Sequence, residues 1–156
     1  MKKIFKKIFF IGLIIFLLIQ LYQPARNIAL EQDLTANFTK VYNVPKNVEA
    51  ILRTSCYDCH SNNTNYPWYS NIQPVGIFMK NHINEGKENL NFNEYGNYSQ
   101  RKQNSKLKAI SKQIKLNEMP LASYTLIHKN AILSSSQKQE VMDWIEKTSD
   151  SLSSKY

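Results

Sequence analysis

Apolar side chains recur every three to four residues in four separate segments of the chain, with polar residues between them. This spacing places the apolar residues on one face of an α-helix, so each segment is predicted to be a helix with one buried face. No segment shows the alternation of apolar and polar residues that is typical of a β-strand. The helices are predicted to begin near Pro45, Pro74, Ser99 and Ser134, and to end at Cys56, at Gly86, before Met119 and at Ile145.

Local signals define two of these boundaries. Ser134 with Gln137 three residues later forms a capping box, which is typical of a helix start. Met119 precedes Pro120, and the residue before a proline is disfavoured in helical conformation. We therefore expect Met119 in an extended segment just after the third helix.

A continuous apolar run at 8–22, broken only by Gln20, lies before these helices and follows four lysines. Positive charge before an apolar run is typical of an export signal, and no small-x-small cleavage site follows it. Positive charge is also retained on the cytoplasmic side of a membrane. The pattern predicts a signal anchor: a single-pass inner-membrane protein with a transmembrane helix at its N-terminus and the remaining chain in the periplasm.

The chain of 156 residues is 42% hydrophobic and 21% charged, which is typical of one globular domain. The N-terminal lysines supply half of the net charge of +8, and the later basic residues are scattered among Asn, Ser and Gln. Without a dense basic run, a nucleic-acid partner is not expected. The predicted organisation is a signal anchor at 1–24, a tether at 25–43, a folded domain at 44–148 and a flexible tail at 149–156.

One motif in the folded domain indicates its chemistry. Cys56-Tyr57-Asp58-Cys59-His60 is C-x-x-C-H, the attachment signal for c-type haem. Two thiols three positions apart at the end of a helix face the same side, so each can bond one vinyl group of a porphyrin. The adjacent histidine then binds the iron as the proximal ligand. We predict one covalently bound haem c, held by Cys56 and Cys59, with His60 on the iron.

Other uses of two cysteines are weaker interpretations. A structural zinc site needs four ligands, and the chain has no second pair of cysteines. A thioredoxin-like dithiol needs a βαβ setting, which the helical pattern does not offer. A disulfide remains possible in an exported protein.

The second iron ligand is less well defined by the sequence. Met119 is the leading candidate, because a thioether on an extended segment after a helix can reach the open face of a haem. His82 is the alternative, since the second helix carries it on the apolar face. His128 is a third candidate. Each has an ordinary structural interpretation: Met119 as core filler, His82 as a hydrogen-bonded core residue, and His128 as a loop residue.

Several other side chains are candidates for the surroundings of the haem. Tyrosine and tryptophan have an apolar body and a polar tip, and arginine can pair with propionates. The same side chains could equally fill the core. The candidates are Arg53, Tyr66, Trp68 and Tyr69.

The segment CYDCHSNNTNYPWYSNIQPVGIFMKNHINEGKENLNF at 56–92 and the segment NEMPLASYTLIHKNAILSSSQKQEVMDWI at 117–145 resemble the small haem-binding domain of bacterial envelope proteins. The second segment is also similar to the end of class I cytochrome c domains, where the methionine of Met-Pro binds iron. The resemblance implies an all-α, cytochrome c-like domain wrapped around one haem, with Met119 as distal ligand. No glycine for the usual contact between the first and last helices stands in 45–55.

Three functions stay open at this point. The first is single-electron transfer by a membrane-anchored cytochrome with redox partner proteins of the cell envelope. The second is a haem-based sensor or peroxidase-like enzyme with an open distal site, in which His82 could act as a base. A dithiol protein without haem is the third interpretation. Electron transfer is preferred because the sequence offers no convincing acid–base pair for an enzyme.

Overall fold

A computed structural model describes residues 1–29 and 35–153. Within these ranges the chain forms helices and one isolated antiparallel bridge between Ile28 and Asn63, which confirms the predicted all-α class. Residues 30–34 of the predicted tether at 25–43, and residues 154–156 of the predicted tail at 149–156, lie outside the described residues. The elements are α1 (Lys2–Ile19), α2 (Phe38–Val41), α3 (Lys46–Ser55), α4 (Tyr57–His60), η1 (Trp68–Asn71), α5 (Val75–Asn89), η2 (Tyr95–Asn97), α6 (Gln100–Lys115), α7 (Ala122–Thr125), η3 (Lys129–Ala131) and α8 (Ser135–Ser153).

The four predicted helices correspond to α3, α5, α6 and α8. The capping box at α8 is confirmed, because the Ser134 N–H donates to Gln137 Oε1 at 2.9 Å and the Gln137 N–H donates to Ser134 Oγ at 3.2 Å. Ser99 caps α6 through its side chain. Gly86 does not end α5, which continues to Asn89. Helix α8 likewise continues beyond the predicted domain end at 148.

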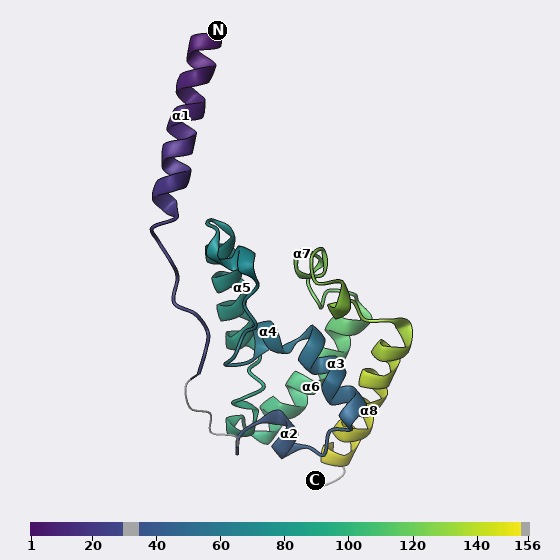
Figure 1. Cartoon of the computed structure of the whole chain (residues 1–156). Coiled ribbons are helices and arrows are strands. Elements are labelled where there is room, and N and C mark those ends of the chain that lie inside the picture. The colour runs from purple at the N-terminus through teal and green to yellow at the C-terminus, as the bar shows by residue number, and fades with distance from the viewer. Residues whose placement is uncertain (30–34, 154–156) are drawn as a thin grey trace.

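The core lies between α3, α6 and α8, with α8 packed against each of the other two helices (Figure 1). At one end of it the ring of Phe38 is fully buried and meets four other aromatic rings edge-on, with centroids 4.8–5.6 Å away. Burial of one large apolar side chain stabilises a fold by about 1.5–3 kcal/mol, so this cluster makes a large contribution. The four rings belong to Tyr42, Phe92, Tyr95 and Trp144.

The prediction of a membrane anchor is wrong. Among the residues that the structure describes, no helix is long and apolar enough to cross a membrane. Helix α1 includes all four N-terminal lysines, and its uninterrupted apolar part at 8–19 is only about 18 Å long at about 1.5 Å per residue. A bilayer core is about 30 Å thick. The predicted single-pass inner-membrane location, with the domain facing the periplasm, is therefore contradicted.

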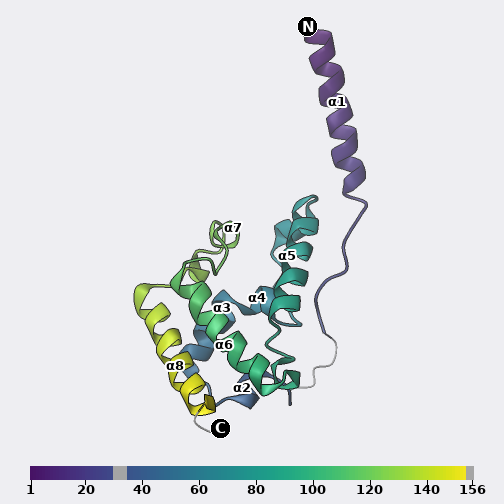
Figure 2. The same ribbon diagram turned by 180° about the vertical axis from the view of Figure 1, so that it is seen from behind.

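Helix α1 extends away from the domain, and only its C-terminal end is held (Figures 1 and 2). The side chain of Gln20 accepts from the Gln73 N–H at 2.8 Å and donates to the Gln73 carbonyl oxygen at 3.1 Å. Arg26 donates to the side chain of Asn71 at 2.6 Å. These bonds fix the end of α1 at the corner between η1 and α5.

Candidate functional site

The C-x-x-C-H motif consists of Cys56, which separates α3 from α4, and the four residues of α4. Cys56 lies between the two helices, and its carbonyl oxygen accepts from the N–H groups of Cys59 at 3.2 Å and His60 at 3.0 Å. This single helical turn brings the three side chains of the motif together. Both cysteines are free thiols and half-buried, so the disulfide interpretation has no support here.

His60 is oriented by the C-terminal end of α5. Its Nδ1 lies 2.9 Å from the carbonyl oxygen of Gly86 and 3.0 Å from that of Leu90. Carbonyl oxygens only accept, so Nδ1 carries the proton and Nε2 keeps its lone pair. Metal-binding histidines usually have this arrangement, in which one ring nitrogen donates to a backbone oxygen. The His60 carbonyl oxygen also accepts from the Phe92 N–H at 2.8 Å.

Burial of the imidazole lowers the pKa of His60, the two carbonyl acceptors oppose that shift, and the charge of Lys106 adds to it. The net effect is a ring that stays neutral at physiological pH. A neutral imidazole with a free Nε2 is the form that binds a metal.

Gly86 permits the contact between α5 and the motif. A Cβ atom at this position would lie 2.7 Å from the Cys59 carbonyl oxygen and 3.3 Å from the Cys59 Cβ. No side chain fits at 2.7 Å from a backbone atom, so only glycine allows α5 to approach closely enough to accept from His60. The glycine predicted as a helix stop is instead a packing residue.

The thiols are protonated in the folded chain. Burial is the largest cause in each case and raises the pKa of Cys56 to about 12 and that of Cys59 to about 11. The neighbouring charges of Cys59 and Asp58, respectively, add to these shifts. Raised thiol pKa values do not favour an activated, low-pKa dithiol of the redox-exchange type.

We expect the thiols of protein made without haem to alkylate slowly. The pKa of Cys59 is raised by about two pH units, so its thiolate fraction near pH 7.5 should be about a hundredfold lower than in the unfolded chain. Iodoacetamide labelling followed by mass spectrometry, with and without urea, measures the ratio. Equal labelling rates in the folded and unfolded states would contradict the expected burial.

The raised pKa values also make the stability of the domain depend on pH. The neutral thiols stabilise the folded state fully below about pH 9, and this stabilisation is lost as the pH rises through 11 to 12.

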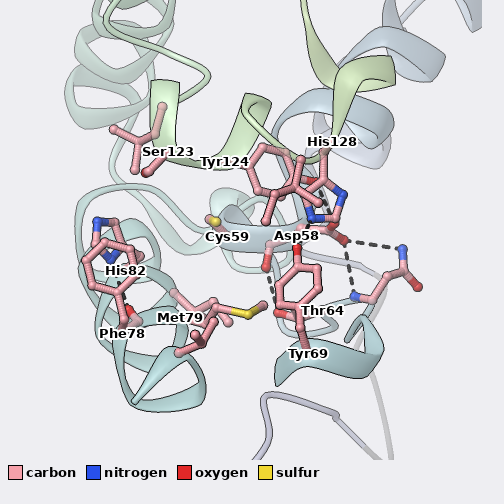
Figure 3. Close-up of a pocket in the computed structure, with 15 residues that line it drawn as sticks. Asp58, Cys59, Thr64, Tyr69, Phe78, Met79, His82, Ser123, Tyr124 and His128 are labelled. Atoms are coloured by element: carbon pink, nitrogen blue, oxygen red, sulfur yellow. Dashed lines mark hydrogen bonds between the residues drawn. The ribbon is translucent and has the colours of Figure 1, made fainter. Parts of the chain in front are cut away.

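A cleft of about 190 Å³ opens beside Cys59 (Figure 3). One wall is the face of α5 that carries Met79 and His82, and the opposite wall is the segment 121–128 around α7. The lining is mainly apolar. Asp58, Tyr69, Tyr124 and His128 gather at one end of the cleft, and His82 lies at the other (Figure 3). The apolar lining side chains are Val75, Phe78, Ile83, Leu121 and Ile127.

The polar end of the cleft is a hydrogen-bonded network. Tyr124 donates its hydroxyl proton to Asp58 Oδ2 at 2.7 Å, and its ring stacks on that of His128 with centroids 4.2 Å apart. The hydroxyl of Tyr69 lies 2.6 Å from His128 Nε2. Burial, followed by the adjacent Asp58 carboxylate, raises the pKa of Tyr124, so this phenol stays protonated. The network ties the segment 121–128 to the attachment motif and to η1.

The predicted iron ligands occupy different places. His82 lines the cleft, and its Nδ1–H donates to the Phe78 carbonyl oxygen at 2.9 Å, which leaves Nε2 with its lone pair. Met119 is half-buried after the end of α6, where its N–H donates to the Gln113 carbonyl oxygen at 3.3 Å. Met119 is not among the residues that line the cleft, and His128 pairs with Tyr69 there.

Of the four side chains predicted to surround the haem, Tyr69 lines the cleft beside Cys59. Arg53 and Tyr66 line an adjacent polar hollow, and Arg53 forms an ion pair with Glu49 at 2.6 Å. Trp68 is 76% exposed.

Sequence reasoning did not single out Met79, Asp58 or Tyr124 as members of a site. The signal for Met79 was present, because Met79 and His82 are one helical turn apart on the face predicted to be buried. Asp58 and Tyr124 are distant in the sequence, and only the fold brings them together.

The residues present fit a covalently attached haem. Two reduced thiols lie one helical turn apart, the adjacent histidine is neutral with Nε2 free, and an apolar cleft opens at Cys59. A family model described as a haem-binding domain matches residues 14–147 of the chain. No curated protein and no solved structure shows a significant match.

Proposed function

Because the chain belongs to the haem-binding domain family, we propose that it is a monohaem c-type cytochrome that carries single electrons between redox partner proteins. The observation that carries the proposal is the orientation of His60: its Nδ1–H donates to the carbonyl oxygens of Gly86 and Leu90 at the C-terminal end of α5. The free thiols of Cys56 and Cys59 belong to the same helical turn as His60. This arrangement supports iron binding through Nε2 next to two attachment points.

Cys56 and Cys59 would hold the haem by adding their thiols to its two vinyl groups. In each thioether bond the cysteine sulfur would bond to one vinyl carbon and the thiol hydrogen would be transferred to the other carbon, so the addition would balance without an oxidant or reductant. The bound haem supplies an iron that gains and loses one electron. The protein holds the imidazole neutral and correctly rotated, and it surrounds the attachment site with apolar side chains.

The test is a redox titration of the full chain produced with haem. We expect a reversible one-electron transition and a low-spin spectrum in both oxidation states, because an electron carrier keeps both axial ligands. A high-spin ferrous form, or rapid binding of carbon monoxide, would contradict the proposal.

We propose Met119 as the distal ligand, with His82 as the alternative. Met119 lies two residues before the cleft wall that starts at Leu121, and its N–H donates to the Gln113 carbonyl oxygen at the end of α6. A methionine opposite a histidine raises the reduction potential of a haem iron.

We expect Met119→Ala to abolish the sulfur-to-iron charge-transfer band of the oxidised protein and to lower its reduction potential. Met79→Ala is the matched control, because Met79 is a thioether on the cleft wall. Loss of the band in Met79→Ala alone would move the assignment to Met79. Loss of the low-spin spectrum in His82→Ala alone would make the site bis-histidine.

A second candidate is a haem sensor or peroxidase-like enzyme. The observation that favours it is His82, which lines the cleft in the tautomer that a distal base requires. Carbon monoxide binding to the reduced protein, accelerated or slowed in His82→Ala, would favour this function over electron transfer.

A further inference from the structure

Helix α6 carries six basic side chains and no acidic one. In the sequence these residues are separated by Asn, Ser, Gln and apolar positions, but the helix aligns four of them. They recur at intervals of seven, four and three residues, which correspond to one face of an α-helix. All four are exposed, and we call this surface the basic face of α6. It consists of Arg101, Lys108, Lys112 and Lys115.

Helix stability explains only part of the basic face. Lys112 and Lys115 lie in the last turn, where the helix dipole favours positive charge. Arg101 lies in the first turn, where the same dipole disfavours it, and Lys108 and Lys112 repel each other at i, i+4. Arg101 and the Lys108–Lys112 pair therefore lower the stability of α6.

Acidic residues of the described chain do not neutralise it. In the described ranges, no carboxylate oxygen lies within 4.0 Å of a basic nitrogen of this face. By contrast, Arg53 and Glu49 of α3 do form an ion pair. Helix α8 packs against α6 and carries four acids, none of which forms an ion pair with the basic face; Glu140 accepts from Asn47, and Asp143 accepts from Gln139 at 2.7 Å. The positive potential of α6 is thus directed to solvent.

Helix α6 also contributes one charge to the candidate site, from Lys106, which lies outside the basic face. Helix α6 lies on the side of the domain that is turned to the viewer in Figure 2. Lys106 of the same helix is near enough to His60 for its charge to act on the imidazole.

We propose that the basic face of α6 is the docking surface for a redox partner protein with an acidic surface, an inference that rests on the proposed electron-carrier function. Complementary charge steers such encounters and raises their association rate. The face is about 21 Å long at about 1.5 Å per residue, which fits the roughly 800 Å² patch of a standard protein interface.

Two other anionic partners fit less well. A membrane surface would require large apolar side chains for insertion, and α6 exposes none between Gln100 and Lys115. Single-stranded nucleic acid would require exposed aromatic rings for stacking, and α6 contains no aromatic residue.

The experiment compares two haem-loaded full-length variants that lose the same charge. In the first, Arg101, Lys108, Lys112 and Lys115 are all replaced by glutamine. In the matched control, four exposed lysines elsewhere are replaced by glutamine. The control positions are Lys40, Lys46, Lys129 and Lys147. Circular dichroism establishes that both variants fold like the unmodified chain.

Reduced flavodoxin, a small acidic protein that carries one electron, serves as the probe in stopped-flow measurements of haem reduction. We expect the rate constant of the α6 variant to fall about tenfold or more at low ionic strength and that of the control to change by less than about twofold. At high salt, the rate constants of the unmodified chain and of the α6 variant should become equal, because salt screens the charges.

Equal rates in the two variants would overturn the docking proposal. Dithionite distinguishes this failure from failure of the proposed function, because this small reductant does not need a docking surface. A chain whose haem dithionite cannot reduce reversibly is not an electron carrier. If the α6 variant instead loses binding to phosphatidylglycerol vesicles or duplex DNA and keeps its flavodoxin rate, the face serves a lipid or nucleic acid and the proposal is wrong.

Discussion

Replacing both Cys56 and Cys59 with serine is expected to abolish covalent haem completely. The two thiols are the described chain's only cysteines, and serine hydroxyls do not add to vinyl groups under the same conditions. In cells with a cytochrome c maturation system, the unmodified chain should gain the mass of one haem and stain for haem after denaturing electrophoresis. The double variant should do neither.

The single variants and a control refine this result. Cys56→Ser and Cys59→Ser should each retain one thioether and therefore a shifted spectrum, while Thr54→Ala, at an exposed neighbouring position, should be unchanged. Haem that survives denaturation in the double variant would exclude thioether attachment. If acid extraction removes the haem from the unmodified chain, the haem is bound non-covalently and the c-type assignment is wrong.

Replacing Gly86 with valine is expected to destabilise the domain by about 3 kcal/mol, because overpacking of a close contact commonly costs about 1–3 kcal/mol and here the obstacle is backbone. The added Cβ would lie 2.7 Å from the Cys59 carbonyl oxygen, so α5 must move away from the motif. The two carbonyl acceptors of His60 lie at the end of α5 and would move with it. Denaturant unfolding of protein made without haem measures the loss.

Asn84→Val is the matched control, because Asn84 is exposed on the same helix. This variant tests the helix propensity of valine without a steric obstacle. We expect it to lower the free energy of unfolding by less than about 1 kcal/mol. In the haem-loaded Gly86→Val protein, a changed iron spectrum would show that the contact orients His60. Equal stability of the two variants would mean that α5 can shift without strain.

The sequence determined the features that depend on neighbouring residues. The C-x-x-C-H spacing within one helical turn, the periodicity of four helices and the Ser134 capping box are local, and a residue's neighbours three or four positions away decide them. The same local reasoning failed for the N-terminal segment, because the pattern of charge before an apolar run does not by itself provide a helix of sufficient apolar length.

Only the tertiary structure decided how the motif is supported. The acceptors of His60 come from residues 26 and 30 positions further along the chain, and the Tyr124 hydroxyl reaches Asp58 across 66 positions. The pattern of apolar residues does not predict such pairs, because they form only when α5 and the segment 121–128 pack against α4. Gly86 shows the difference between the two. From the sequence it was predicted to end a helix, whereas in the fold its missing side chain permits the contact that orients the imidazole of His60.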